Sequence, residues 1–189
     1  MENTSPPTHS QYRWYHELKQ LFVQSLERYR VGEQNPERHF TDEQKAYLGS
    51  IGMTPQELYD FAEDHAKYDG DPDWETVLLI SAARRDYFLT VQHGQFSDKK
   101  VATDELPAKD AKIDGVPWLA RLIKKAEAKL RGEMSADLMY GCGGDRRFCQ
   151  EYGVHPADFL RHVWAHNGDE GKMLAFVKAS KPVNAFTEI

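Results

Sequence analysis

The same order of apolar residues, glycines and prolines occurs twice in this chain, at positions about 100 residues apart. Residues 14–33 align with residues 116–133 and, after one inserted residue, residues 46–65 align with residues 147–166. The aligned pairs include Leu18 with Trp118, Phe22 with Leu122, Gly32 with Gly132, Gly52 with Gly153, Pro55 with Pro156 and His65 with His166. Two consecutive blocks that keep one order of such residues favour an internal duplication, so the sequence predicts two repeated units.

Each unit is expected to contain four helices, because its apolar residues recur at three- and four-residue steps. No segment alternates apolar and polar residues with the period of a β-strand. The predicted helices cover about residues 11–30, 41–52, 54–65, 73–92, 117–132, 145–153, 155–166 and 169–179. We therefore predict an all-α fold, in which two repeated four-helix units pack into one bundle-like protein.

Most of the predicted helices have a chemical reason to begin where they do. Thr54 and Glu57 have the spacing of a capping box, and Pro55 between them suits the first helical position. By the same reasoning, Pro117 is predicted to open the first helix of the second unit, and Asp145 to cap the second. Other predicted starts are Thr41 with Gln44, Asp73, His155 with Pro156, and Asp169.

The charge divides the chain into unlike parts. Residues 11–93 form the predicted N-terminal helical repeat, which is acidic: residues 1–93 together carry 16 acidic and 9 basic groups, a net charge of −7. Residues 94–115 are polar and have few large apolar residues, which favours a linker with little core of its own. Residues 116–189, the predicted C-terminal repeat, carry 9 acidic and 11 basic groups, a net charge of +2. We expect residues 1–10 to be a disordered tail.

Composition excludes several classes of protein. The chain has 189 residues, of which 40% are hydrophobic and 12% aromatic, and this is too many core-forming residues for a disordered chain. No apolar run approaches the ~20 residues of a membrane span, and the first residues do not form a signal peptide. Cys142 and Cys149 match neither a disulfide framework nor a C-x-x-C metal site. We therefore expect a soluble cytoplasmic protein that does not bind a membrane.

Residues 113–179 carry a family resemblance. The stretch WLARLIKKAEAKLRGEM is followed by Tyr140, by GGDRRFCQEYGVHPADFLRHV and by the final helix. This order resembles the bacterial domain of unknown function 5069, whose members begin with a similar L-x-R-L-I-x-K-A segment and continue with an Asp-Arg-x-Phe stretch before a glycine turn. The resemblance implies a helical fold and a bacterial, cytosolic protein, and it implies no activity. The N-terminal half shares the pattern only through the internal repeat.

The helix, glycine turn and proline-started helix of residues 147–166 superficially resemble a DNA-binding helix-turn-helix. A DNA reader needs lysines and arginines on its recognition helix, because phosphate contacts supply most of the affinity. The segment HPADFLRHVWAH offers one arginine, and its counterpart TPQELYDFAED is acidic. We expect a helical hairpin here and no nucleic-acid partner.

A glycine-rich loop at residues 141–147 is the first candidate site. Glycines allow backbone N–H groups to converge, a helix N-terminus attracts anions, and paired arginines can fork onto phosphate or carboxylate. The predicted anion-binding residues are Gly143, Gly144, Arg146, Arg147 and Lys125. Against this prediction, Asp145 as a helix cap would occupy the amides that an anion needs. Cys142 has no histidine beside it in the sequence to activate it as a nucleophile.

Two histidines on one helix are the second candidate site. His162 and His166 are four residues apart, so both imidazoles project from one face, as two metal ligands require. His65, the repeat counterpart of His166, would supply a third ligand if the two units packed face to face. The alternative is that these are hydrogen-bonded structural histidines. The sequence does not identify a cofactor.

These features support two hypotheses about function. The first is a non-enzymatic helical binding or interaction protein, which associates with itself or with another protein, because aromatic-rich amphipathic helices occur without a recognisable catalytic set. The alternative is a small metal- or anion-binding enzyme with its site between the two helical repeats. That enzyme would use the three histidines with a metal, or the glycine-rich loop with a small anionic ligand.

Overall fold

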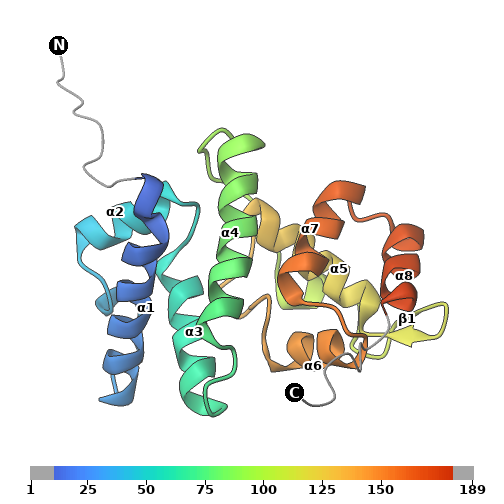
Figure 1. Ribbon diagram of the computed structural model, residues 1–189, viewed down its shortest axis with the longest axis horizontal. Helices are drawn as coiled ribbons and strands as arrows, with labels where there is room; N and C mark the ends of the chain where they lie inside the picture. Colours follow the sequence, from blue (N-terminus) through green and yellow to red (C-terminus); the bar gives the residue numbers. More distant parts are fainter. Residues whose placement is uncertain (1–10, 181–189) are drawn as a thin grey trace, which may run out of the picture.

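The computed structural model describes residues 11–180, and eight α-helices make up most of this part of the chain (Figure 1). The helices are α1 (Trp14–Arg30), α2 (Asp42–Ser50), α3 (Pro55–Lys67), α4 (Trp74–Thr90), α5 (Leu119–Arg131), α6 (Gly143–Glu151), α7 (Pro156–His166) and α8 (Glu170–Ala179). A two-stranded antiparallel hairpin, β1 (Lys112–Ile113) and β2 (Val116–Pro117), precedes α5. The predominantly α-helical class is confirmed. The tail predicted at residues 1–10 lies outside the described residues.

Most of the predicted helix starts are confirmed by their hydrogen bonds. The Thr54 hydroxyl accepts from the Glu57 N–H, and the Glu57 carboxylate accepts from the Thr54 N–H at 2.8 Å, which completes a capping box at the start of α3. Thr41 and Gln44 form the same motif on α2, and the Asp73 carboxylate caps α4. These starts were predictable because each bond joins residues close together in the sequence.

Two predicted starts are wrong. Pro117 does not open a helix, because it ends β2, and α5 begins only at Leu119 after Trp118 adopts a left-handed φ of 67°. Before it, Asp114 and Gly115 have φ values of 45° and 83°, as the two central residues of a tight hairpin turn require. Asp145 is not a helix cap, because α6 begins at Gly143 and Cys142 occupies the capping position.

The helices form two groups, one at each end of the described structure, with α4 between them. Helices α1, α2 and α3 lie at one end, α4 stands in the middle, and α5 to α8 form the other end (Figure 1). Helix α1 packs on α3, while α4 packs on both α5 and α7, and the buried apolar residues of the two groups form one continuous core. The duplication and the division into domains stay predictions.

One buried arginine ties the two groups together. Arg84 on α4 is 0% exposed, and its Nη1 donates to the Leu130 carbonyl of α5 at 2.9 Å and to the Gln92 side chain at 2.6 Å. A Cβ at Gly132 would lie 2.6 Å from Arg84 Nη2, and Gly132 also has a φ of +68°. The predicted end of α5 at Gly132 is therefore confirmed, and glycine is needed there for both space and backbone conformation.

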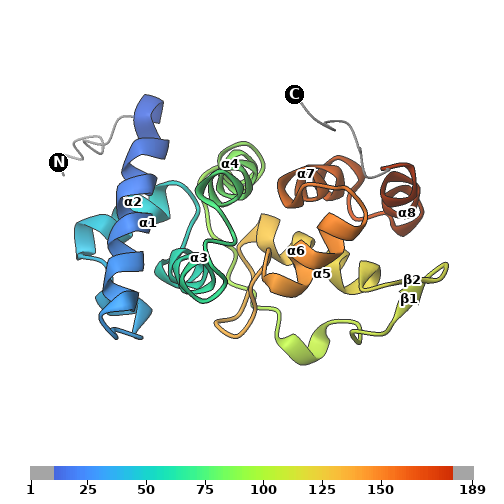
Figure 2. The same ribbon diagram turned by 60° about the horizontal axis from the view of Figure 1, so that its bottom comes forward.

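Residues 94–115, the predicted linker, follow the C-terminal group towards the end that carries α8 (Figure 2). The Val101 N–H donates to the Glu133 carbonyl at 2.7 Å, and Leu106 is 7% exposed. Arg121 on α5 donates to the Pro107 carbonyl at 2.8 Å. The segment is therefore held against α5 and the chain that follows it.

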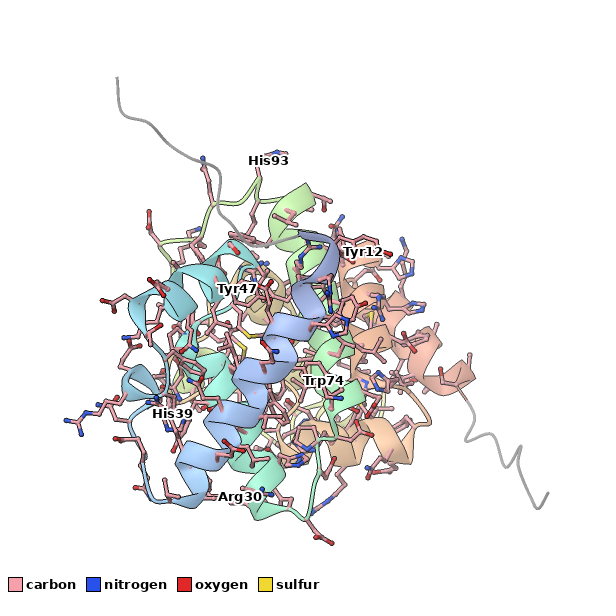
Figure 3. The ribbon with its side chains drawn as sticks, turned by 60° about the vertical axis from the view of Figure 1, so that its left-hand side comes forward. Tyr12, Arg30, His39, Tyr47, Trp74 and His93 are labelled. Carbon is pink, nitrogen blue, oxygen red and sulfur yellow. The ribbon has the colours of Figure 1, made fainter. Side chains whose placement is uncertain are left out.

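Helix α1 crosses the outer face of the N-terminal group, with Tyr12 near one end and Arg30 at the other (Figure 3). The loop after α1 is fixed to it by His39, which is 0% exposed. The two ring nitrogens of His39 lie 2.8 Å from Ser25 Oγ and 2.9 Å from the Glu33 carbonyl. Within residues 11–180, no helix has the length and apolar character needed to span a membrane.

Candidate binding pocket between the two halves

Three carboxylates on α3 lie on the side of the helix that faces the C-terminal group. Glu57, Asp60 and Asp64 follow one another at steps of three and four residues, which places them along one helical face. Two of the three form ion pairs with cations from the other half of the chain. These pairs define the boundary at which the candidate pocket lies.

The first pair joins Glu57 to Lys129 of α5. The lysine Nζ lies 2.7 Å from Glu57 Oε1, and the Lys129 and Glu57 side chains are 2% and 13% exposed respectively. Burial alone would raise the pKa of Glu57, but the charge and hydrogen bond of Lys129 together hold this pKa below its usual value. Glu57 therefore has two roles, as the capping residue of α3 and as the counterion of a buried lysine.

The second pair joins α3 to α6 through Arg146, whose side chain is 4% exposed. Its guanidinium lies 2.9 Å from the carboxylate of Asp64 and 2.7 Å from that of Asp71, and it also donates to the Gly141 carbonyl at 2.6 Å. Burial would lower the pKa of Arg146, but the two carboxylates raise it above its usual value. Arg146 thus joins α6 to two acidic residues of the N-terminal half.

Asp145, beside Arg146, points into the protein and is 0% exposed. Its carboxylate accepts from Lys125 Nζ, from the Gly141 N–H at 2.9 Å and from Trp118 Nε1 at 3.0 Å. The Cys142 side chain makes no capping hydrogen bond. The first N–H groups of any α-helix have no hydrogen-bond partner within the helix. Because Asp145 does not cap them, the N–H groups at the first turn of α6 can bind another partner.

A pocket of about 520 Å³ lies at this first turn. The N-terminal half contributes Asp64, Tyr68 and Asp71 to its wall, and the C-terminal half contributes residues 142–144, Arg146, Arg147 and Gln150. Four of the five residues predicted to bind an anion therefore line one pocket. The fifth, Lys125, lies behind the wall, where its Nζ donates to Cys142 Sγ at 3.2 Å and to Asp145.

Two of the residues that line the pocket differ in how closely the rest of the protein holds them. Gly144 packs so closely on Trp118 that an added Cβ would lie 2.7 Å from the indole ring, so this position requires glycine. Arg147 is exposed, and its guanidinium makes no ion pair or hydrogen bond within the described part of the chain. Arg147 is thus the lining cation that remains available to a ligand.

The His65 side chain is held by residues of the N-terminal half. Its Nδ1 lies 2.8 Å from the Pro72 carbonyl, and its ring packs edge-on against Phe22 at a centroid distance of 5.4 Å. In the predicted metal site, the His65 imidazole would have to approach His162 and His166 in the second half of the chain.

His162 and His166 lie together on α7, with ring centroids 5.8 Å apart. The His162 ring stacks on Phe176 of α8 at 3.6 Å, so its face is covered by a phenyl group. Among residues 11–180, no three His, Cys, Asp or Glu side chains are placed to hold a metal ion. The structure therefore does not bring the three predicted histidine ligands together.

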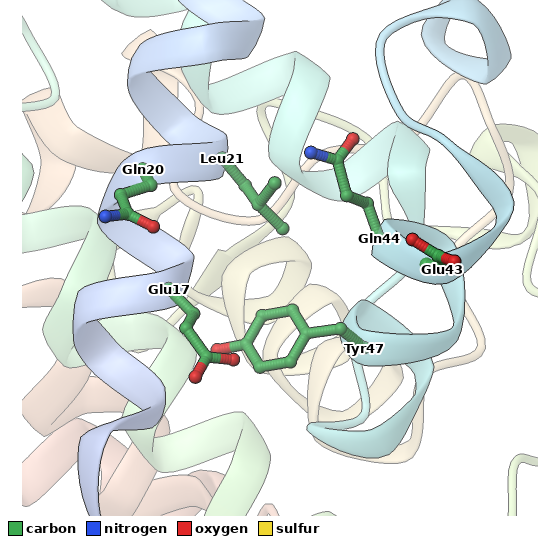
Figure 4. Close-up of a pocket in the computed structure, with 6 residues that line it drawn as sticks. All are labelled: Glu17, Gln20, Leu21, Glu43, Gln44 and Tyr47. Atoms are coloured by element: carbon green, nitrogen blue, oxygen red, sulfur yellow. The ribbon is translucent and has the colours of Figure 1, made fainter. Parts of the chain in front are cut away.

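A smaller pocket of about 190 Å³ lies between α1 and α2, where the Glu17 carboxylate and the Tyr47 ring point toward one another (Figure 4). The Tyr47 hydroxyl donates to the Trp14 carbonyl. Burial, with a smaller contribution from the negative charge of Glu17, raises the pKa of this phenol well above its usual value. Tyr47 therefore serves to hold α2 against α1.

The sequence analysis missed Asp64 and Asp71 as site residues. They reach Arg146 across 82 and 75 residues of chain, a separation at which no local pattern pairs one residue with another. The only local signal was the acidic spacing of Glu57, Asp60 and Asp64 on one face of α3, which indicates a shared environment without naming the partners.

One family model matches part of the chain. Residues 104–189 match the model of DUF5069, a domain of unknown function, and this confirms the resemblance predicted for the C-terminal half. The matched range contains α5 to α8 and the predicted anion-binding residues. No curated protein and no solved structure matches the chain.

Proposed function

We propose that this protein is a helical binding protein and that the pocket between α3 and α6 holds a small anionic ligand, such as a phosphate ester or a carboxylate. The observation that carries the proposal is the orientation of Asp145. Its carboxylate is bound by Lys125 and the Gly141 N–H, so it does not cap α6. The N-terminal turn of α6 lines the pocket beside Arg147, and both favour an anion.

The acidic residues of the pocket fit this proposal. Asp64 and Asp71 are held by Arg146, so the three side chains form one hydrogen-bonded group on the N-terminal side of the pocket. An anion would instead bind on the α6 side, at Gly143, Gly144 and Arg147. This arrangement predicts that Arg146 maintains the shape of the pocket, whereas Arg147 contacts the ligand.

A thermal-melting experiment with two matched arginine variants tests the proposal. We expect inorganic phosphate, or a member of a panel of phosphorylated metabolites, to raise the melting temperature of the wild-type protein. Arg147→Gln should abolish this rise. Arg161→Gln should preserve it, because Arg161 is a partly exposed arginine on α7 whose ion-pair partner among the described residues is Asp158 of its own helix. Equal responses in both variants, or none in the wild type, would contradict the proposal.

An enzyme at the same pocket is the second candidate, and it is favoured by the position of Cys142. The thiol lines the pocket at the N-terminus of α6, and Lys125 Nζ lies 3.2 Å from its sulfur. Reactive cysteines are found in such electropositive and partly exposed surroundings. Cys149 provides an internal comparison, because burial raises the pKa of its thiol to about 12.

Alkylation separates the two candidates. Iodoacetamide should modify Cys142 and leave the buried Cys149 intact, and a bound anion should slow the modification of Cys142. The enzyme hypothesis further requires a covalent adduct of a substrate on Cys142, visible by mass spectrometry and absent from Cys142→Ser. If ligands protect Cys142 without ever forming an adduct, the binding-protein hypothesis is the better one.

Self-association, the other partner expected from the sequence, is tested separately. Sedimentation of the wild-type chain over a range of concentrations measures its oligomeric state directly. A monomer at all concentrations would contradict a self-associating protein and leave the anion pocket as the candidate binding surface.

A further inference from the structure

The third carboxylate on the inner face of α3, Asp60, has no cation of its own. Glu57 pairs with Lys129 and Asp64 with Arg146, but in residues 11–180 no lysine, arginine or histidine forms an ion pair with Asp60. Its hydrogen-bond partner is the Gln56 amide, which donates to Oδ1 at 2.7 Å. Burial raises the pKa of Asp60 to about 7, and the nearby negative charges of Glu57 and Glu63 add to this rise.

Asp60 lines a cleft of about 340 Å³ between the first two turns of α3 and residues 132–138. The opposite wall is largely apolar, because it contains Met134 and Leu138, which are 9% and 6% exposed. A carboxylate at one side and an apolar wall at the other are the two features that an amphiphilic cation requires. This cleft is distinct from the pocket at the start of α6.

The cations near this cleft already have other partners. Lys129 donates to Glu57, and Lys100, which also lines the cleft, donates to the Gly132 carbonyl at 3.1 Å. Neither ammonium group is within ion-pair distance of Asp60 in the described residues. The carboxylate therefore keeps the capacity to accept hydrogen bonds from a charged donor.

We propose that this cleft binds a small primary amine with an apolar chain, whose ammonium group pairs with Asp60 and whose chain packs on Met134 and Leu138. The amine would supply to Asp60 what Lys129 supplies to Glu57, a charge-assisted hydrogen bond shielded from water. Burial of the chain against the apolar wall adds a contribution that grows with each methylene group. This inference does not depend on the anion site, because the two clefts have different walls.

Hexylammonium, 1-hexanol and hexanoate are matched probes, because they share one chain length and differ in charge. At about pH 8 the primary amine is protonated, since the similar amine of lysine has a pKa of about 10.4. We expect hexylammonium to shift the backbone NMR signals of residues 132–138 and to raise the melting temperature more than 1-hexanol does. Hexanoate should be the weakest ligand. Equal binding of the amine and the alcohol would overturn the proposal.

Two variants on α3 locate the charged contact. Asp60→Asn keeps the size of the side chain and removes its charge, and should weaken hexylammonium binding by about tenfold or more, which corresponds to about 1.4 kcal/mol. Glu63→Gln removes a charge from the next turn, where Glu63 pairs with Lys67 at 3.0 Å, and should weaken binding far less than Asp60→Asn, because Glu63 acts on Asp60 only through its negative charge. Unchanged affinity in Asp60→Asn would overturn the proposal.

A measurement on the wild-type protein makes the test independent of any variant. Carbon NMR of the Asp60 carboxyl group follows its protonation directly. Hexylammonium should lower the midpoint of this titration by favouring the ionised form, whereas 1-hexanol should not. An unchanged midpoint at a hexylammonium concentration that saturates the NMR shifts would place the amine away from Asp60 and overturn the proposal.

Discussion

Two neighbouring carboxylates on the inner face of α3, Asp60 and Asp64, differ in how their charges are balanced. Asp64 lies 2.9 Å from Arg146, while one turn earlier Asp60 receives an amide hydrogen bond from Gln56 and has no ion pair within residues 11–180. Both carboxylates lie at helical spacing on the same face, so the difference comes from what the C-terminal half places opposite them. Helix α6 presents an arginine, whereas residues 132–138 present an apolar wall.

This difference separates residues that hold the halves together from residues that remain available. A buried charge with a partner is costly to disturb, because removal of the partner leaves an uncompensated ion in a poorly solvated place. A buried charge without a partner already carries that cost, so its removal should stabilise the protein. The following substitutions test this contrast, from the largest expected effect to the smallest.

The largest loss is expected for Lys129→Met, which leaves Glu57 buried without its cation. Breaking a buried ion pair in this way typically costs about 3–5 kcal/mol. Urea denaturation measures the change in free energy of unfolding. The double variant Glu57→Gln, Lys129→Met should recover part of the loss, because it removes both charges. If the double variant is as unstable as the sum of the single variants, the two residues do not interact as proposed.

Arg146→Met should cost about 2–3 kcal/mol, because it removes charge-assisted hydrogen bonds and leaves Asp64 in a poorly solvated position. The expected loss is smaller than for Lys129→Met because Asp71, the other acidic partner, is 51% exposed and can be solvated by water. Urea denaturation again gives the free energy of unfolding. A loss equal to or greater than that of Lys129→Met would reverse the predicted order.

Asp60→Asn should increase the free energy of unfolding, unlike Lys129→Met and Arg146→Met, which should decrease it. The folded-state pKa of Asp60, about 7, lies above the ordinary value for aspartate of about 3.9. The folded protein therefore holds a proton that the unfolded chain releases, and the contribution of Asp60 to stability falls as the pH rises from about 4 to 7. At about pH 8, Asp60→Asn should stabilise the protein by roughly 1–2 kcal/mol.

The pH dependence of this variant provides its control. At about pH 4, where the carboxyl group is protonated in the folded state, Asp60→Asn and the wild type should have similar stabilities. Urea denaturation at both pH values measures the difference. Destabilisation at about pH 8 would show that the Asp60 carboxylate has a favourable partner, and the contrast between Asp60 and Asp64 would then be lost.

The sequence predicted those features of this boundary that depend on neighbouring residues. The capping box of Thr54 and Glu57 joins positions three residues apart, so its geometry follows from the helix itself. Four predicted anion-binding residues share one pocket for a similar reason, because all four lie within the first five residues of α6. Their closeness in the sequence was sufficient to place them together.

The errors arose where a residue suits two positions equally well. Asp145 is as compatible with the first turn of a helix as with its cap, and the choice depends on Lys125, 20 residues away, and on Trp118. Pro117 likewise fits the end of a strand as well as a helix start. The ion pairs across the boundary join residues 72 to 82 positions apart, so only the packed fold brings them together.

The smallest effect is expected for Asp71→Asn, which removes the exposed partner of Arg146. Although Asp71 lies closer to the guanidinium than Asp64 does, its side chain is 51% exposed, whereas that of Asp64 is 15% exposed. Water and salt therefore screen its charge, and we expect a loss of only about 0.5 kcal/mol. Asp64→Asn, measured by the same urea denaturation, should cost more. If the two losses were equal, distance rather than burial would decide how strongly these carboxylates join the halves.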